Sequence, residues 1–155
     1  FDPIPSDPDA LTIVFEDAHC VVLLKPAGQA SLPLRSDEVD TLANALAAYC
    51  PETVRVGESR RDCGLLHRLD TGTSGLLLAA KTRTAFEWFR AAQARDEFEK
   101  GYVAICEGVP ELGKIESPLA HRGPRMALDD DGRDACTEVL AAERRGGMSP
   151  SRIHI

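Results

Sequence analysis

His67-Arg68-Leu69-Asp70-Thr71-Gly72-Thr73-Ser74-Gly75 is the most informative stretch of this sequence, and the apolar residues 76–80 follow it directly. An apolar run after a glycine-rich turn is typical of a buried strand. The turn itself carries one carboxylate, Asp70. Aspartate in such a turn often accepts hydrogen bonds from neighbouring backbone, so spacing alone favours a structural role for Asp70 over a chemical one.

The residues before the turn give Asp70 a predicted orientation. If residues 65–70 are extended, successive side chains alternate between two faces. Leu66, Arg68 and Asp70 then share one face, and the other face takes Leu65, His67 and Leu69. A hydrolase that uses Asp70 together with His67 is therefore disfavoured, because the two side chains point apart.

Composition indicates a soluble protein, and the cysteine usage described below favours the cytoplasm. The 155 residues fit one domain, and 43% hydrophobic and 28% charged residues are ordinary for a globular chain. No apolar run reaches the ~18 residues of a membrane span, so we expect no membrane partner. The acidic, proline-rich residues 1–10 do not resemble a secretory signal. Because the chain begins at Phe1, a preceding segment is left open.

The cysteines favour reduced, buried thiols and no metal. The five are odd in number, dispersed and without a CxxC pair. None of them combines with the histidines at a spacing typical of zinc ligands. The full set is Cys20, Cys50, Cys63, Cys106 and Cys136.

The net charge of −7 argues against nucleic acid as a partner, but its distribution weakens that argument. Residues 1–54 carry two basic and nine acidic side chains, whereas residues 55–100 carry nine basic and seven acidic ones. The basic excess thus surrounds the Asp70 segment. On charge alone, a solvated surface with chance clustering is the simpler interpretation.

Periodicity predicts short strands and two helices. Residues 11–15 and 20–24 form a hairpin, and Lys25-Pro26-Ala27-Gly28 ends the second strand. One helix begins after Asp40 or Thr41 and ends before Pro51. A second begins at Thr84 with a Thr84–Glu87 capping box. Its broad apolar face predicts core positions for Phe86, Trp88 and Phe89.

Further strands are predicted at residues 102–106 and 135–140, and residues 151–155 resemble the start of another. Alternation places Lys100 and Tyr102 on one face. We expect an α+β fold, with a mixed, mainly antiparallel β-sheet and helices packed on it. Residues 1–10 are expected to be an N-terminal extension, and residues 11–155 a single domain that is incomplete at its C-terminus.

Four motifs in order resemble the RluA family of RNA pseudouridine synthases. The Asp70 block, continued through Leu76-Leu77 and Ala80-Lys81-Thr82, resembles the family signature. Lys25-Pro26-Ala27-Gly28 is similar to the N-terminal turn, and Lys100-x-Tyr102 to the second motif. Gly132-x-x-Ala135-x-Thr137 is similar to a later strand. The resemblance spans residues 11–155, and four ordered motifs rarely arise by chance.

The resemblance implies an isomerase that converts uridine in RNA to pseudouridine without metal or organic cofactor. Asp70 would be the catalytic carboxylate, as a nucleophile at C1′ or as the base of an elimination; the sequence leaves both open. Tyr102 would stack on the flipped uracil or assist proton transfer. Arg152, in a partly matching third motif, would pair with Asp70 and keep it ionised.

The same resemblance implies rRNA or tRNA as the partner. The sequence leaves the oligomeric state open, and a monomer is favoured. Arg68 would fill the space of the displaced nucleotide. The other expected RNA contacts are His67, Lys100, Arg122 and Arg125. A protein of this fold that binds RNA or the ribosome without turnover is the alternative.

Overall fold

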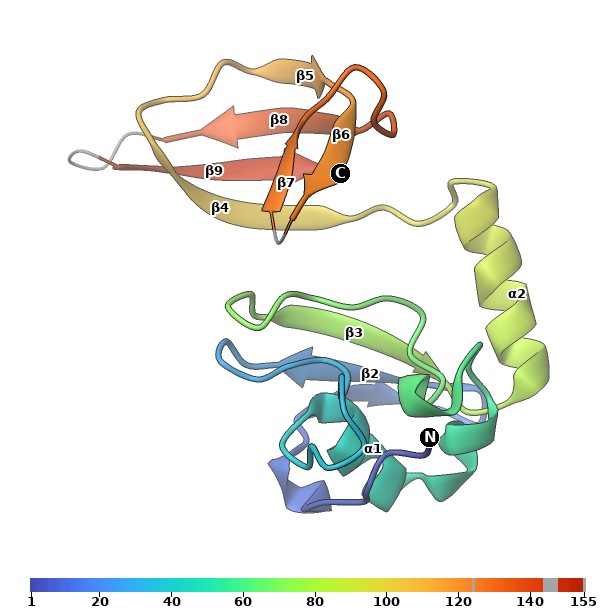
Figure 1. Ribbon diagram of the computed structural model, residues 1–155. Helices are drawn as coiled ribbons and strands as arrows, with labels where there is room; N and C mark the ends of the chain where they lie inside the picture. Colours follow the sequence, from blue (N-terminus) through green and yellow to red (C-terminus); the bar gives the residue numbers. More distant parts are fainter. Residues whose placement is uncertain (124, 144–147, 155) are drawn as a thin grey trace. The chain divides into compact units, whose positions relative to one another are not determined.

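The computed structural model describes residues 1–123, 125–143 and 148–154, with only the backbone for Arg125 and residues 148–154. The chain forms two compact units, unit 1 (Phe1–Glu97) and unit 2 (Phe98–Ile155) (Figure 1). Every strand pairing among the described residues is antiparallel. This architecture confirms the expected α+β class. The helix content of the described chain is two α-helices and three short 3-10 turns.

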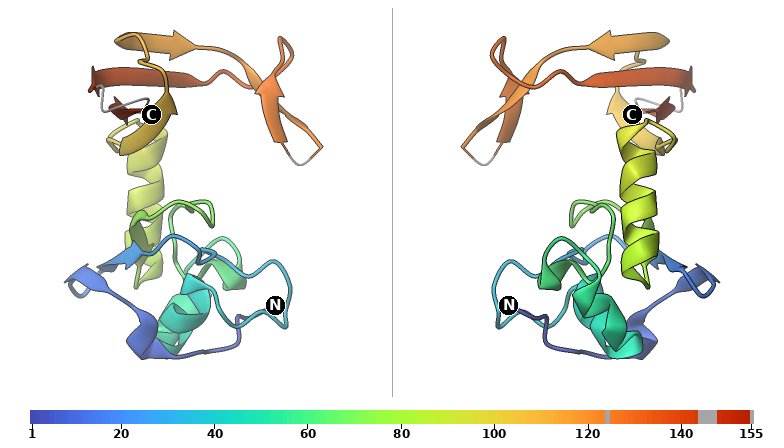
Figure 2. Two further views of the ribbon diagram at one scale, coloured as in Figure 1. Left: turned by 90° about the vertical axis from the view of Figure 1, so that its left-hand side faces the viewer. Right: turned by 90° about the vertical axis from the view of Figure 1, so that its right-hand side faces the viewer.

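Unit 1 is built on a three-stranded sheet in the order β1-β2-β3. The strands are β1 (Ile13–Glu16), β2 (Cys20–Lys25) and β3 (Gly75–Ala80), so the predicted hairpin and the strand after the Asp70 turn are confirmed. Helix α1 (Leu42–Tyr49) lies on one face of this sheet (Figure 2). The 3-10 turns are η1 (Pro8–Ala10), η2 (Pro51–Arg55) and η3 (Arg60–Asp62).

The core of unit 1 lies between this sheet face and α1. The alternating positions of β2 and β3 that face α1 are apolar and buried. Fully buried core residues include Val21, Leu23, Leu42, Leu46, Leu77 and Ala79. Burial of each leucine contributes about 1.5–3 kcal/mol before the entropy cost of folding. The next inward position along β2 is Lys25, which is also fully buried.

The N-terminal residues of unit 1 contact the first turn of helix α1. Thr41 is the N-cap of α1, and its side chain forms a capping box with Asn44. Residues 1–10, expected to be an extension, contact this region, since Ser6 N donates to the carbonyl of Asn44 at 3.1 Å. Arg60 also pairs with Asp2 at 2.8 Å. A domain boundary at residue 11 stays a prediction.

The N-cap of helix α2 (Arg83–Ala94) lies two residues earlier than expected. Its N-cap is Thr82, whose extended backbone lets its side chain accept from Ala85 N. The predicted capping box at Thr84 is therefore wrong, and Glu87 instead pairs with Arg83 at 2.8 Å. The aromatic face predicted for α2 is only partly buried.

In that face, Phe86 is buried and Phe89 is partly buried, whereas Trp88 is 62% exposed. The core position predicted for Trp88 is therefore wrong. The three aromatic side chains span a wider arc of α2 than the part of the helix that packs against β3, so one of them faces solvent.

Unit 2 holds a four-stranded sheet in the order β4-β9-β8-β5 and a separate β6–β7 hairpin (Figure 2). The predicted strands correspond to β4 (Gly101–Glu107), β8 (Cys136–Ala142) and β9 (Met148–His154). Sequence reasoning missed three strands of four residues each. They are β5 (Gly113–Glu116), β6 (Leu119–Arg122) and β7 (Arg125–Leu128).

The cysteines divide by unit. Cys20, Cys50 and Cys63 are buried in unit 1, as expected for structural thiols. In unit 2, Cys106 is only partly buried and Cys136 is exposed, so the prediction of five buried thiols is wrong for these two. The strands that carry them have little apolar cover within their own unit.

Candidate active site

The Asp70 segment runs beside β3 before it turns away. Leu65 forms an isolated antiparallel bridge with Ala79. Leu66 N donates to the carbonyl of Leu78 at 3.0 Å, and Ala80 N donates to the carbonyl of Gly64 at 2.9 Å. These bonds fix the start of the segment to the sheet.

Burial after this bridge follows the predicted alternation except at Leu66. Arg68 and Asp70 are both exposed and Leu69 between them is buried, so a shared face for Arg68 and Asp70 stays a prediction. Leu66, expected on the same face, is instead buried in a cluster with Phe86. The reason is that Phe86 of α2 covers the chain at this position, so Leu66 is buried although its predicted face is the solvent side.

The Asp70 carboxylate is free of its own turn. Thr73 N donates to the backbone carbonyl of Asp70 at 2.9 Å, and this closes the turn without the side chain. Among residues whose side chains are described, no hydrogen bond or ion pair to this carboxylate is found. The structural role that spacing alone favoured is thus not seen. An exposed carboxylate on a closed turn is available to a substrate.

Lys25 lies beneath this turn as a fully buried cation. Its ammonium donates to the carbonyls of Gln29 at 2.6 Å, Pro26 at 3.0 Å and Thr71 at 3.4 Å. Burial lowers the pKa of Lys25, and the negative charge of Asp70 opposes that shift. Sequence reasoning treated Lys25 only as part of a strand-ending turn. Its place at an inward position of β2, after Val21 and Leu23, was the available signal.

Ser31 holds the other side of Asp70. Its hydroxyl donates to the carbonyl of Leu69 at 2.7 Å and accepts from Leu69 N at 3.0 Å. Gly28 N donates to the carbonyl of Thr71 at 2.7 Å. Loop residues 25–31 therefore contact the backbone immediately before and after Asp70.

His67 and Arg68 differ in their surroundings. His67 is partly buried, and its Nε2 accepts from Leu78 N at 3.4 Å, which ties it to β3. Arg68 is exposed, and no ion pair of its guanidinium is found among the described side chains. Both RNA contacts stay predictions, and the surroundings favour Arg68.

The remaining predicted site residues belong to unit 2. Tyr102 is half-buried on β4, and Lys100 is exposed just before that strand. On β9, Arg152 pairs with Val103, and the neighbouring Ile153 pairs with Tyr102. The Arg152 side chain lies outside the described part of the structure. Convergence of Asp70, Tyr102 and Arg152 stays a prediction.

The β6–β7 hairpin carries the other two predicted RNA contacts. Arg122 pairs in register with Arg125 beside the hairpin turn. Arg122 is exposed and forms an ion pair with Asp129. The side chain of Arg125 lies outside the described residues. The Arg122 side chain is 70% exposed and that of Asp129 only 10% exposed, so the solvent-facing side of the guanidinium stays accessible to a phosphate.

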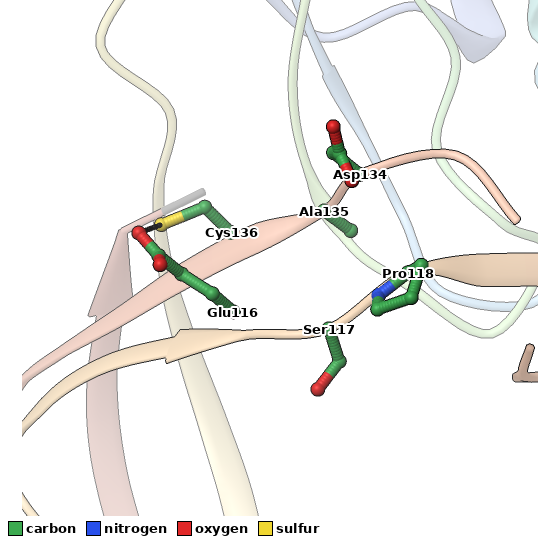
Figure 3. Close-up of a pocket in the computed structure, with 6 residues that line it drawn as sticks. All are labelled: Glu116, Ser117, Pro118, Asp134, Ala135 and Cys136. Carbon is green, nitrogen blue, oxygen red and sulfur yellow. Dashed lines mark hydrogen bonds between the residues drawn. The ribbon is translucent and has the colours of Figure 1, made fainter. Parts of the chain in front are cut away.

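A pocket of about 430 Å³ lies in unit 2, and none of the predicted site residues line it. Figure 3 shows its walls where β5 ends and β8 begins, with Cys136 Sγ 3.9 Å from a carboxylate oxygen of Glu116. Glu116 and Asp134 make the wall acidic. Acidic walls repel phosphate, so this pocket does not suit an RNA backbone.

Two features are absent from the described residues. No group of three or more His, Cys, Asp or Glu side chains there could hold a metal ion. None of the described helices has the length and apolar character needed to cross a membrane.

Comparisons with known proteins identify the family. The family model for RNA pseudouridylate synthase matches residues 19–152. A ribosomal large subunit pseudouridine synthase D from Zymomonas mobilis is 40% identical over 128 residues, which cover 79% of this chain and 40% of that protein. The Pseudomonas aeruginosa protein of the same name is 33% identical over 94% of this chain and 45% of its own length.

The fold comparison agrees. The structure of human RNA Pseudouridylate Synthase Domain Containing 1 matches with a TM-score of 0.67 and 17% identity, covering 97% of this chain and 60% of that one. Of the Zymomonas mobilis and Pseudomonas aeruginosa relatives, the chain spans 40% and 45% of the length, which is under half of each. On the family match and the extent of these similarities, the chain belongs to the RNA pseudouridylate synthase family, in the RluA group that its motifs predicted.

Proposed function

We propose that the protein isomerises uridine in RNA to pseudouridine, with Asp70 as the catalytic carboxylate. The observation that carries this proposal is the exposed Asp70 side chain, which pairs with no described side chain and lies on a turn whose backbone is fixed on both sides. Family membership supports it, because the matched region, residues 19–152, includes the whole turn. The names of the curated relatives favour RNA of the large ribosomal subunit over tRNA.

The reaction rearranges bonds without a change in composition. The N1–C1′ bond breaks, the uracil turns, C5 bonds to C1′, and the proton leaves C5 while N1 gains one. An ionised aspartate can attack C1′, as in retaining glycosidases, or remove the C2′ proton. Asp70 is suited to both roles because no described side chain occupies its carboxylate.

The other predicted residues have complementary roles in this proposal. Flipping a uridine out of the RNA costs a few kcal/mol, and stacking on Tyr102 would return about 1–3 kcal/mol. Arg68, which is exposed, would occupy the space that the nucleotide leaves. Arg152 would neutralise part of the charge of Asp70. Arg122 and Arg125 would contact phosphates.

Replacement of Asp70 by asparagine tests the proposal, because the amide keeps the shape and removes the charge. The full-length protein and its Asp70→Asn variant are expressed in cells that lack the gene, and pseudouridine is mapped in ribosomal RNA. We expect a site that only the wild-type protein modifies. Asp96→Asn is the matched control, since Asp96 is an exposed acid in unit 1 whose positive φ of 56° asparagine tolerates.

Two outcomes would contradict the proposal. Equal modification by wild-type protein and Asp70→Asn would remove Asp70 from catalysis. Tight binding of both to ribosomal RNA, with no modified site in either strain, would favour the RNA-binding alternative.

A further inference from the structure

The loop formed by residues 25–31 contacts the Asp70 turn through two buried side chains that differ in chemistry. Lys25 is 0% exposed and Ser31 is 4% exposed. Each of them bonds backbone more than 35 residues away in the sequence, at Thr71 and Leu69 respectively. Leu69 and Thr71 are the two neighbours of Asp70.

The Ser31 hydroxyl forms two hydrogen bonds with the backbone of Leu69. One hydroxyl both donates to the carbonyl and accepts from the N–H of Leu69, so both polar backbone groups of that residue are satisfied. The Leu69 side chain is itself buried, which leaves this peptide little freedom. The backbone that enters Asp70 is therefore fixed by packing and by two hydrogen bonds.

The Lys25 contact fixes the backbone that leaves Asp70. Its ammonium has three donors, and three carbonyls accept from them, those of Pro26, Gln29 and Thr71. The Thr71 carbonyl also accepts from Gly28 N at 2.7 Å. Among the described side chains, no carboxylate lies at hydrogen-bond distance from this ammonium, so only carbonyls offset the cost of burying its charge.

We propose that Lys25 and Ser31 are positioning residues that together hold the Asp70 carboxylate in its reactive geometry. This inference rests on the proposed role of Asp70. Neither side chain is accessible to RNA, so both act through the backbone of the turn. The buried ammonium also supplies a fixed positive charge beside Asp70.

A role in positioning predicts a loss in kcat with little change in KM. Displacement of a reacting group by about 1 Å costs about 10²-fold in rate, so we expect Ser31→Ala and Lys25→Met each to lower kcat about 100-fold. The exposed residues that face RNA are unchanged in both variants, so we expect KM to stay within about threefold.

The measurement is single- and multiple-turnover kinetics of the full-length protein on its ribosomal RNA substrate. Thr53→Val is the matched control for Ser31→Ala, because Thr53 is fully buried and its hydroxyl donates to the carbonyl of Cys50 within unit 1. Lys81→Met is the control for Lys25→Met. Both controls should keep the wild-type kcat.

A second readout does not depend on activity. Hydrogen exchange of the Leu69 amide, which donates to Ser31, should accelerate about tenfold in Ser31→Ala. Exchange of core amides in β2 and β3 should stay near the wild-type rates. If Lys25→Met does not fold, Ser31→Ala alone decides.

The possible outcomes separate this inference from the proposed function. If Ser31→Ala and Lys25→Met keep kcat within twofold while Asp70→Asn is inactive, the positioning role is wrong and Asp70 stays catalytic. A rise in KM at constant kcat would likewise overturn the positioning role. An active Asp70→Asn would instead overturn the proposed function.

Discussion

Gly64 begins the segment that carries Asp70, and its replacement by alanine tests how closely that segment is bound to β3. Its φ is +71°, and an added Cβ would lie 2.2 Å from the carbonyl oxygen of Ala80. The left-handed backbone costs alanine about 1–2 kcal/mol. Separation of the two strands would also break the hydrogen bond from Ala80 N to Gly64 O, worth about 0.5–1.5 kcal/mol. With the residual strain, we expect Gly64→Ala to lower the free energy of unfolding by about 3 kcal/mol.

Two other glycines provide graded controls. Gly28 also has a positive φ, +93°, but no atom lies within 4 Å of an added Cβ. Gly28→Ala should therefore cost only the conformational part, about 1–2 kcal/mol. Gly72 has neither a positive φ nor a neighbour within 4 Å. Gly72→Ala should leave stability unchanged or raise it by up to about 1 kcal/mol, because alanine restricts the unfolded chain.

The assay is urea denaturation of the full-length protein, followed by far-UV circular dichroism. Free energies of unfolding are compared among variants for which that free energy falls with urea concentration at the same slope. The order of stability should be Gly72→Ala, then Gly28→Ala, then Gly64→Ala. If Gly64→Ala were as stable as Gly28→Ala, the close approach of Gly64 to Ala80 would be refuted. The start of the Asp70 segment would then not be fixed by β3.

Two further predictions concern titratable groups. Glu16 pairs with Lys81 at 2.7 Å, which lowers the pKa of Glu16 below its ordinary 4.5 and raises that of Lys81 above 10.5. The pair therefore stabilises the fold between these values, and its contribution is lost as pH falls through the folded pKa of Glu16 or rises through that of Lys81. Lys81→Met should cost about 0.5–1 kcal/mol more at neutral pH than in acid, where only the hydrogen bond of Lys81 to the carbonyl of Asp17 is lost, and a constant difference across a pH series of denaturation curves would contradict this. Burial raises the pKa of the Cys63 thiol to about 12, whereas Cys136 is exposed. A thiol reagent at mildly alkaline pH should modify Cys136 in the native protein and Cys63 only after unfolding, as peptide mapping would show; equal rates would refute the burial of Cys63.

The sequence predicted those helices and strands that depend on neighbouring residues alone, through periodicity and capping. The strand at residues 20–24 is one residue shorter than β2, and Thr41 caps α1 as one of the two residues considered. The cap of α2 was misplaced because Thr82 and Thr84 both fit the pattern, and only the tertiary path of the chain selects between them. Short strands such as β5 have too few residues for a period to emerge.

The contacts around Asp70 could not be predicted for a different reason. Ser31 and Leu69 are 38 residues apart, and Lys25 and Thr71 are 46 apart, so no window of sequence contains both partners. The motif resemblance indicated that residues 25–28 belong with the Asp70 block, but a resemblance carries no geometry. Only the fold shows that one loop holds the backbone of the other.

Lys25 also separates stability from function at this site. A buried charge is weak evidence for stability, since an apolar side chain of similar size often serves a core equally well or better. Val21, Leu23 and Lys25 are alternate residues of β2, and all three are buried. Lys25 therefore puts a cation at a position where the pattern of the strand predicts an apolar residue. The three carbonyls that accept from its ammonium belong to loop 25–31 and to Thr71, not to the core between β2 and α1. The lysine therefore stabilises one backbone arrangement, the turn that presents Asp70 to solvent, and its burial is best explained by that arrangement.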